Sequence, residues 1–317
     1  ISMSLGIRQI SAAYDRISPF IHKTPLIRSK EIDKLCGCEI IFKADNFQKV
    51  GAFKARGACN AIMSMEEERL RRGVITHSSG NHGAALAWAA AMKKTDCIVV
   101  MPKNASAVKV DAVNCYGGTV LFCEPTMCAR ETMVQDFVSK QCSQFIHPFD
   151  DYSVIAGQGT IAVEFASQLD GLLDKILVPV GGGGLISGIS VFVKDKGGLA
   201  SQVIGTEPEK ARDAADSFYG GIHVTEYEPK TMADGLRATL GVKNFEIISK
   251  NVDDFALASE AQIVEATKLI WSRLKVLVEP SAAVPLAAIL NNPNYFRGQR
   301  IGIILSGGNI DLDNLPW

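Results

Sequence analysis

The sequence lacks an excess of charge of either sign, because its 33 lysines and arginines face 34 aspartates and glutamates. A formal net charge of −1 gives no electrostatic reason to expect nucleic acid or a membrane surface as a partner. The chain has no uninterrupted apolar stretch of the ~20 residues that a bilayer-spanning helix needs. Its first residues, ISMSLGIRQI, also lack the basic and then apolar pattern of a secretory signal. These absences predict a cytoplasmic protein with no nucleic-acid or membrane partner.

Cysteine pairs at a metal-binding spacing are missing as well. None of the eight cysteines belongs to a Cys-x-x-Cys pair, so we expect no zinc site. Several cysteines lie inside apolar runs, such as Cys97 in DCIVV and Cys123 in VLFCE. Without a secretory signal, the cysteines are expected to be free, reduced thiols in the core of a cytosolic protein.

A run of four consecutive glycines is the most distinctive stretch of the chain. The residues before it, KILVPV from Lys175 to Val180, predict a buried strand, and LISGISVFV after it predicts a helix. The N–H groups of such a turn and of the first helical turn attract an anion. The spacing fits neither G-x-G-x-x-G nor the P-loop. The turn therefore predicts a phosphate held by backbone amides alone, those of Gly181, Gly182, Gly183 and Gly184. The alternative is a structural turn without a ligand.

The rest of the chain alternates between predicted strands and helices. Residues 73–150 give the pattern β-α-β-α-β-α-β, which is typical of a small parallel sheet covered on both faces. The alternation resumes after Asp150, and 317 residues are enough for two domains. We therefore expect an α/β protein with two parallel-sheet domains. The small domain (73–150) is inserted into the large one (1–72 and 151–317).

Lys54 is the candidate nucleophile. It lies in GAFKARG at the expected start of a helix, among apolar neighbours. The positive end of the helix and the apolar surroundings favour a neutral amine, which is a nucleophile. On its own, a solvated surface lysine is the simpler interpretation. Together with a backbone phosphate site, a nucleophilic lysine points to pyridoxal phosphate, which carries a phosphate and an aldehyde.

Four motifs, in this order, carry a resemblance to a known family: GAFKARG (51–57), HSSGNHG (77–83), VGGGGLISG (180–188) and LSGGN (305–309). They resemble the fold-type II (tryptophan synthase β-like) pyridoxal-phosphate enzymes, and among these the serine racemase and serine/threonine dehydratase family. The resemblance implies that Lys54, beside Phe53, bonds the cofactor aldehyde and that the four glycines hold its phosphate. It also implies that Asn81 contacts the ring oxygen and Ser306 the pyridine nitrogen. The family usually has serine where this chain has Ala52, which leaves any polar contact from that position open.

The HSSGNHG motif follows a predicted strand and begins a predicted helix, so its amides and hydroxyls suit a substrate carboxylate. The candidates are Ser78, Ser79, Asn81 and His82. The alternative is a helix cap without a ligand. In racemases that the motif resembles, a serine at the position of Ser79 faces the cofactor opposite the lysine, whereas threonine dehydratases typically have alanine there. The resemblance also places two further residues at the substrate cleft, Arg130 and Thr239.

Two bases on opposite faces of a Cα carbon invert its configuration, so the resemblance implies interconversion of L- and D-serine by Lys54 and Ser79. Loss of the β-hydroxyl implies a second reaction, elimination to pyruvate and ammonia. The alternative is a dehydratase of serine, threonine or 3-hydroxyaspartate with little racemisation. A nicotinamide dehydrogenase fits the interval of about 20 residues to Glu207 but not the glycine spacing. A non-catalytic binding module leaves Lys54 and Ser306 without a role.

A cation site is suggested by the stretch TEPEKARD, where two acids follow a predicted strand. Carboxylates and a carbonyl suit a hard cation, although surface acids are the simpler interpretation. The resemblance assigns the Glu207 carboxylate, the Ala211 carbonyl and the Asp213 carboxylate to Mg²⁺, or to Ca²⁺ or Mn²⁺.

The resemblance also raises the question of nucleotide binding. Animal racemases of the family bind ATP between subunits, at positions that match Lys49, Tyr116 and Asn309. This chain departs from the family beside these positions, at Val50 and Ala84, which leaves ATP binding open. The resemblance further implies a homodimer.

Overall fold

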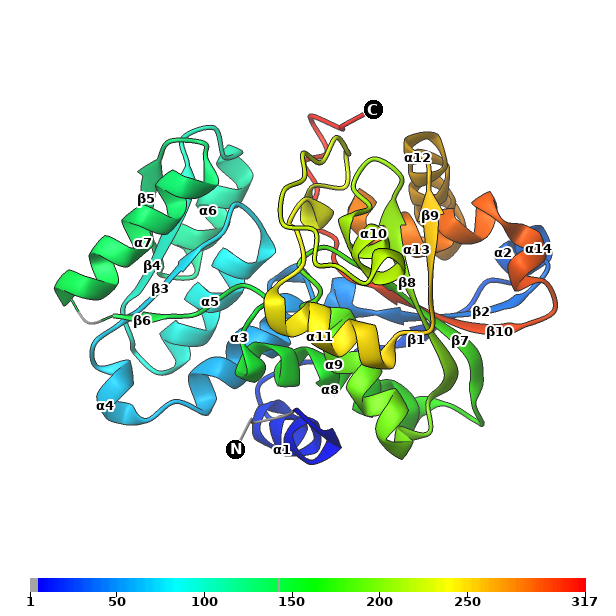
Figure 1. The fold of residues 1–317 in the computed structure, drawn as a ribbon, viewed down its shortest axis with the longest axis horizontal. Helices are drawn as coiled ribbons and strands as arrows, with labels where there is room; N and C mark the ends of the chain where they lie inside the picture. The colour runs from blue at the N-terminus through cyan, green and yellow to red at the C-terminus, as the bar shows by residue number, and fades with distance from the viewer. Residues whose placement is uncertain (1–4, 142) are drawn as a thin grey trace.

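The strands of the computed structural model form two sheets that lie next to each other (Figure 1). The structure describes residues 5–141 and 143–317. The larger sheet has the strand order β1-β2-β10-β7-β8-β9, and the smaller sheet has the order β5-β4-β3-β6. Neighbouring strands are parallel in both sheets except for the β1–β2 pair. The α/β class with two parallel sheets is therefore confirmed.

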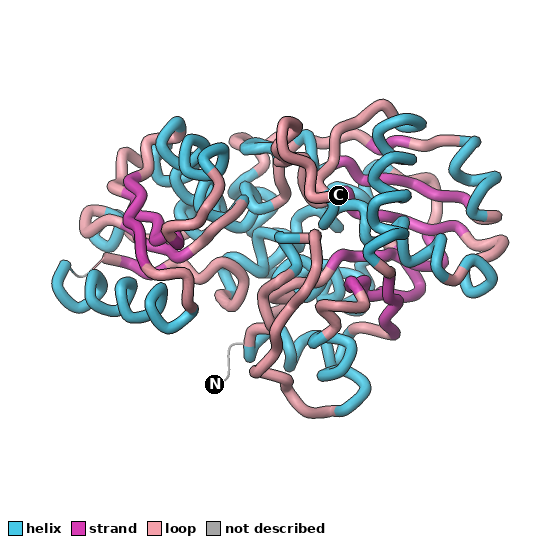
Figure 2. The backbone as a smooth tube through the Cα atoms, turned by 90° about the horizontal axis from the view of Figure 1, so that it is seen from above, coloured by secondary structure: helices cyan, strands magenta, loops and turns pink. Residues whose placement is uncertain are grey.

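Helices surround both sheets (Figure 2). The larger sheet consists of β1 (Leu26–Ile27), β2 (Glu39–Ala44), β7 (Leu173–Pro179), β8 (Ala200–Pro208), β9 (Asp254–Ala258) and β10 (Arg300–Leu305). The smaller sheet consists of β3 (Val74–His77), β4 (Cys97–Pro102), β5 (Thr119–Cys123) and β6 (Gln144–Phe145). The α-helices are α1 (Ile7–Ile17), α2 (Lys30–Cys36), α3 (Lys54–Met63), α4 (Glu67–Leu70), α5 (Asn81–Met92), α6 (Ala107–Cys115), α7 (Met127–Gln141), α8 (Tyr152–Gln168), α9 (Gly184–Phe192), α10 (Asp213–Gly220), α11 (Val242–Asn251), α12 (Glu260–Leu269), α13 (Pro280–Asn291) and α14 (Pro293–Phe296).

The larger sheet has a hydrophobic core on each face. Successive residues of a strand point to opposite faces, so Ile303 of β10 joins the cluster with α2, α12 and α13, and Ile304 joins the cluster with α1, α8 and α9. Because both faces are covered, β10 is an almost continuous apolar run instead of an alternating one. Strand β10 pairs with β2 on one side and β7 on the other. The last strand of the chain therefore lies in the interior of the sheet.

Some expectations from the sequence are wrong. Asp213 begins helix α10, and β9 and α11 are elements that the sequence analysis did not predict. The seven cysteines among the described residues are free, but Cys115 and Cys128 are exposed and are not core thiols. Cys142 lies outside the described residues, and the domain boundaries stay a prediction. Within the described residues, no helix has the length and apolar character needed to cross a membrane.

Candidate active site

Three of the sequence motifs follow the carboxyl ends of adjacent parallel strands. GAFKARG comes after β2, LSGGN after β10 and the glycine run after β7, and these strands are neighbours in the order β2-β10-β7. The first two motifs are joined directly: the Phe53 N–H donates to the Ser306 carbonyl oxygen at 2.9 Å, and Ala52 forms an isolated β-bridge with Gly307. The carboxyl edge of a parallel sheet is where α/β proteins bind ligands.

The HSSGNHG motif reaches this edge from the smaller sheet. Asn81, the first residue of α5, donates from Nδ2 to Glu279 Oε1 at 2.9 Å. Its Oδ1 accepts from Asn309 Nδ2 at 2.9 Å. A Cβ atom on Gly307 would lie 2.6 Å from Glu279 Oε1. The Glu279 carboxylate therefore lies between Asn81 of HSSGNHG and Gly307 of LSGGN. Three of the four motifs, GAFKARG, LSGGN and HSSGNHG, are thus in direct contact with one another.

Glu279 is a site residue that the sequence analysis missed. It is 5% exposed and directly precedes α13. Burial and the charge of Asp234 raise the pKa of Glu279 to about 7. The only signal in the sequence was an acid inside the apolar run VLVEPSAAVP, and a buried carboxylate there must find a partner elsewhere in the chain. That partner, Asn81, is 198 residues away.

The glycine run forms the predicted turn between a strand and a helix. Strand β7 ends at Pro179 and α9 begins at Gly184, with Gly183 in the left-handed region at φ 90°. Asn244 of α11 fixes the turn, because its Nδ2 donates to the Gly182 carbonyl oxygen at 2.8 Å. The N–H groups at the start of α9 are left without side-chain caps, as an anion site at a helix N-terminus requires.

Lys54 lies beside this glycine turn. Its Nζ donates to the Pro148 carbonyl oxygen at 2.9 Å, and the next residue, Phe149, packs on the turn so closely that a Cβ on Gly182 would lie 2.2 Å from its ring. Burial lowers the pKa of Lys54 to about 8, although the charge of Glu279 acts in the opposite direction. Lys54 is therefore a half-buried lysine whose amine is neutral in about a tenth of the molecules at pH 7, next to the backbone anion site at the start of α9.

The other residues of HSSGNHG surround the start of α5. The Ser78 hydroxyl is engaged within the turn, since it accepts from the Gly80 N–H at 3.2 Å, and Ser79 is half-buried. His82 is 2% exposed, and burial lowers its pKa well below the usual range. Both ring nitrogens of His82 are buried without a hydrogen-bond partner among the described residues.

The two residues added by resemblance lie at the margin of this region. Arg130 of α7 has a buried Nε without a partner among residues 5–141 and 143–317. Burial and the Arg130 charge lower the pKa of His77, which precedes Ser78, to about 4. Thr239 is half-buried and lies two residues before Gly241, whose N–H donates to the Gly182 carbonyl oxygen at 3.1 Å.

The predicted metal ligands lie at the end of β8 and the start of α10. Glu207 Oε2 accepts from the Ala215 N–H at 2.8 Å, and Asp213 Oδ2 accepts from the Leu240 N–H at 3.1 Å. Burial raises the pKa of Glu207 well above its usual value, and the Asp213 charge adds to this. Burial also raises the pKa of Asp213 to about 6. The described residues contain no group of three or more His, Cys, Asp or Glu side chains able to hold a metal ion, so a cation here would also need oxygen from Ala211 or water.

The predicted nucleotide residues are only partly brought together. Asn309 Nδ2 donates to the Val50 carbonyl oxygen at 2.8 Å, which places Asn309 against the residue that follows Lys49. Tyr116 caps the end of α6 and packs, like Val50, against the core of the smaller sheet. ATP binding stays a prediction.

Comparisons with known proteins agree with this geometry. A family model described as "Pyridoxal-phosphate dependent enzyme" matches residues 17–307. The chain is 45% identical over 308 residues to a beta-hydroxyaspartate dehydratase of Paracoccus denitrificans (strain Pd 1222), with 96% of each chain covered. It is 44% identical over 316 residues to a serine racemase of Dictyostelium discoideum, covering 98% of this chain and 97% of the relative.

Among solved structures, that of maize serine racemase superposes with a TM-score of 0.93 at 39% identity, covering 97% of this chain and 94% of the other. The hypothesis of a nicotinamide dehydrogenase has no support in these matches. The family match, the full-length relatives and the convergence of the four motifs lead to one conclusion: the chain belongs to the family of pyridoxal-phosphate-dependent enzymes.

Proposed function

We propose that the protein is a pyridoxal-phosphate-dependent serine racemase that also converts serine to pyruvate and ammonia. The observation that carries this proposal is the position of Lys54, a half-buried lysine whose pKa is lowered to about 8. It is linked through Pro148 and Phe149 to the glycine turn at the start of α9. The resemblance of the chain to serine racemases over nearly its full length supports the choice of substrate.

The residues present fit the cofactor. The turn has no room for a side chain at Gly182, and the first N–H groups of α9 lie at its end. The backbone of Gly181 to Gly184 would therefore hold the phosphate. Lys54 would bond the aldehyde. Ser306, 3% exposed at the end of β10, would donate its hydroxyl hydrogen to the pyridine nitrogen. Asn81, whose Nδ2 now donates to Glu279, would contact the ring oxygen.

Bound pyridoxal phosphate would supply an electron-withdrawing ring that acidifies the Cα–H of an attached amino acid. The protein must then move the proton. The lowered pKa of Lys54 lets its amine accept a proton near neutral pH. Ser79, in the turn before α5, would return a proton to the other face. The N–H groups of the Ser78–Asn81 turn would orient the substrate carboxylate.

Two measurements on purified protein test this function. Borohydride reduction after incubation with pyridoxal phosphate, followed by peptide mapping, should place the pyridoxyl group on Lys54. Chiral analysis of L-serine reactions should show D-serine, together with pyruvate. A pyridoxyl group on another residue would contradict the role of Lys54, and pyruvate without D-serine would reject the racemase.

A second candidate function is dehydration of 3-hydroxyaspartate, which one observation favours. The buried, unpartnered Nε of Arg130 near His77 offers a donor for a second carboxylate at the end of the substrate side chain. The matching dehydratase of Paracoccus denitrificans supports this substrate class. A dehydratase would release oxaloacetate and ammonia from 3-hydroxyaspartate with a higher kcat/KM than pyruvate from serine. Arg130→Ala would lower only the first of these rates.

We also propose a divalent cation, Mg²⁺ above others, at Glu207, the Ala211 carbonyl and Asp213. Burial raises the pKa values of these two carboxylates, and a cation bound between them would favour their charged forms. Family resemblance further supports a cytoplasmic homodimer. Sedimentation of the purified protein tests the dimer, since a mass near the 34.1 kDa of one chain would contradict it.

A further inference from the structure

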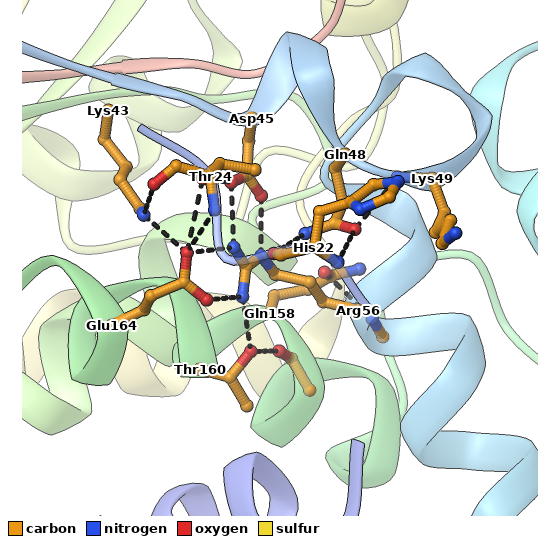
Figure 3. A network of polar contacts seen from close by, with 12 residues as sticks. His22, Thr24, Lys43, Asp45, Gln48, Lys49, Arg56, Gln158, Thr160 and Glu164 are labelled. Atoms are coloured by element: carbon orange, nitrogen blue, oxygen red, sulfur yellow. Dashed lines mark hydrogen bonds and ion pairs between the residues drawn. The ribbon is translucent and has the colours of Figure 1, made fainter. Parts of the chain in front are cut away.

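A cluster of charged side chains is buried beneath the start of α3 (Figure 3). Lys43, Asp45 and Arg56 are 0% exposed and Glu164 is 1% exposed. They come from β2, from the turn after β2, from α3 and from α8. Two cations and two carboxylates make the cluster neutral as a whole. Taking four charges out of water is costly unless each is paired and hydrogen-bonded.

Arg56 is the centre of this cluster, and its donors are fully used. A guanidinium group has five N–H donors, and Arg56 makes hydrogen bonds to Asp45 (2.6 and 2.9 Å), Glu164 (3.2 and 3.2 Å) and Thr160 (3.4 Å). Burial raises the pKa of Asp45, but the Arg56 guanidinium outweighs this and holds it below the usual range. The planar Arg56 guanidinium therefore binds both the Asp45 and the Glu164 carboxylates, and it cannot rotate without losing several of these hydrogen bonds.

Lys43 closes the cluster from the other side. Its Nζ donates to Glu164 Oε1 (2.5 Å), the Thr24 carbonyl oxygen (2.7 Å) and Gln168 Oε1 (2.8 Å). Thr24 in turn donates from its N–H to Glu164 Oε1 at 2.7 Å. The Glu164 carboxylate, on α8, is thus held in place independently of Arg56. It therefore fixes the position of the Arg56 guanidinium.

Helix α8 also supports the glycine turn. On one side it touches α3, since a Cβ on Gly157 would lie 2.6 Å from the Arg56 carbonyl oxygen. On the other side it touches α9, since a Cβ on Gly188 would lie 2.4 Å from the Ile155 carbonyl oxygen of α8. Lys54 begins α3, and the glycine turn leads into α9. The amine and the phosphate cradle are therefore both positioned against the same helix.

We propose that Arg56 is a positioning residue for Lys54, because its paired bonds to Asp45 and Glu164 lock the first turn of α3 onto α8. The proposal rests on the proposed role of Lys54 as the residue that bonds the cofactor. It adds that the distance from the amine to the glycine turn is set by α8 and by the cluster beneath α3. Lys54 and Arg56 are two positions apart, so on a helix they point to nearly opposite sides. Arg56 therefore acts on Lys54 through the backbone.

The effect is mechanical because the cluster is neutral. The groups that influence the Lys54 amine are its own burial and the Glu279 carboxylate, and the amine in turn lowers the pKa of His82 and His147. No charge of the cluster is among them. If the first turn of α3 shifts, the amine gains access to water and its pKa rises from about 8 toward the usual ~10.4. The pKa of Lys54 thus reports its position.

The experiment uses the full-length apoprotein, so that bound cofactor does not mask the amine. Acetic anhydride in trace amounts labels lysines between pH 6 and 10, and mass spectrometry of the peptide containing Lys54 gives the pKa of its amine. Arg56→Lys keeps the charge but loses the fork that grips two carboxylates. We expect the pKa of Lys54 to rise by about one unit, which reduces its neutral fraction at pH 8 from about a half to about a tenth. Labelling at pH 8 then falls about fivefold relative to a lysine peptide standard.

Two further variants keep the test decisive. Glu164→Gln removes the anchor on α8 and leaves Arg56 intact, so it reports on the same lock if Arg56→Lys does not fold. Ile263→Ala on α12, buried on the opposite face of the larger sheet, lowers stability without touching the cluster, and it should leave the pKa of Lys54 unchanged.

The possible results separate two failures. The inference is overturned if Lys54 in the folded cluster variants keeps the pKa of the wild type, or if Ile263→Ala raises it equally. The proposed function fails by a different readout, a pyridoxyl group on a residue other than Lys54 after borohydride reduction of the wild-type protein.

Discussion

Removal of one carboxylate from the proposed cation site should have opposite effects on stability with and without Mg²⁺. Asp213 is 2% exposed, and burial raises its pKa to about 6, against about 3.9 in an unfolded chain. Between these values the folded protein binds more protons than the unfolded chain, so its stability falls as the pH rises from about 4 to about 6. The shift of about two units corresponds to about 3 kcal/mol, which the metal-free protein has lost at pH 7.5.

The variant Asp213→Asn removes this titration and keeps an oxygen that can accept from the Leu240 N–H. In EDTA at pH 7.5, the variant should be more stable than the wild type, by up to about 3 kcal/mol in urea unfolding. In 5–10 mM Mg²⁺, about the range needed for a weak site, the order should reverse, because only the wild type gains a cation between Glu207 and Asp213.

Measurement at pH 5 provides the control for this comparison. At pH 5 Asp213 is mostly protonated in the folded protein but ionised in the unfolded chain, so Asp213→Asn should exceed the wild type in EDTA by only about 1.5 kcal/mol, half of the difference at pH 7.5. Mg²⁺ should also stabilise the wild type less than at pH 7.5. If the wild type is the more stable of the two in EDTA at pH 7.5, the argument that burial disfavours the charged form of Asp213 is refuted. Equal stabilisation of both proteins by Mg²⁺ would show that the cation binds elsewhere.

Three other perturbations test the active site. Ser79→Ala should reduce D-serine formation from L-serine at least about a hundredfold, while pyruvate release from one enantiomer persists. If chiral chromatography of serine and a pyruvate assay show both activities equally retained, a pair of bases on opposite faces is ruled out. Gly182→Ala should weaken pyridoxal phosphate binding to the apoprotein in a fluorescence titration, because its Cβ would lie 2.2 Å from an aromatic ring, whereas Gly220→Ala, with no atom within 4 Å, should bind normally. Glu279→Gln should shift the pH midpoint of Lys54 labelling below about 8, because the Glu279 charge raises that pKa, and an upward shift would contradict the electrostatic assignment.

The parts of the site that the sequence predicted are those whose chemistry is local. A strand, four glycines and a helix specify the turn at Gly181–Gly184 within 20 residues, and the structure has this turn. The apolar neighbours of Lys54 predicted a lowered pKa, and burial causes one. In each case neighbouring residues supply the backbone geometry and the environment.

The parts that the sequence did not predict depend on contacts between distant segments. Glu279 and Asn244 meet the motifs only after folding. The apolar run around Glu279 indicates that its carboxylate is buried but does not indicate its partner. The same holds for Arg56, which pairs with a glutamate 108 residues away. Helix α11 was also not predicted, although Phe245 and Ile248 pack on the core three residues apart, a spacing that favours a helix.

The position of β10 has a consequence for biosynthesis. This strand follows every other described strand in the chain, yet it sits between β2 and β7. On the ribosome, the smaller sheet can assemble as soon as residue 145 has left the exit tunnel. The larger sheet stays incomplete until residues 300–305 emerge, because β2 and β7 each pair with β10 and not with each other. Pyridoxal phosphate therefore meets a finished pocket only after β10 has emerged, and a nascent polypeptide stalled before this strand would expose two apolar strand edges to chaperones.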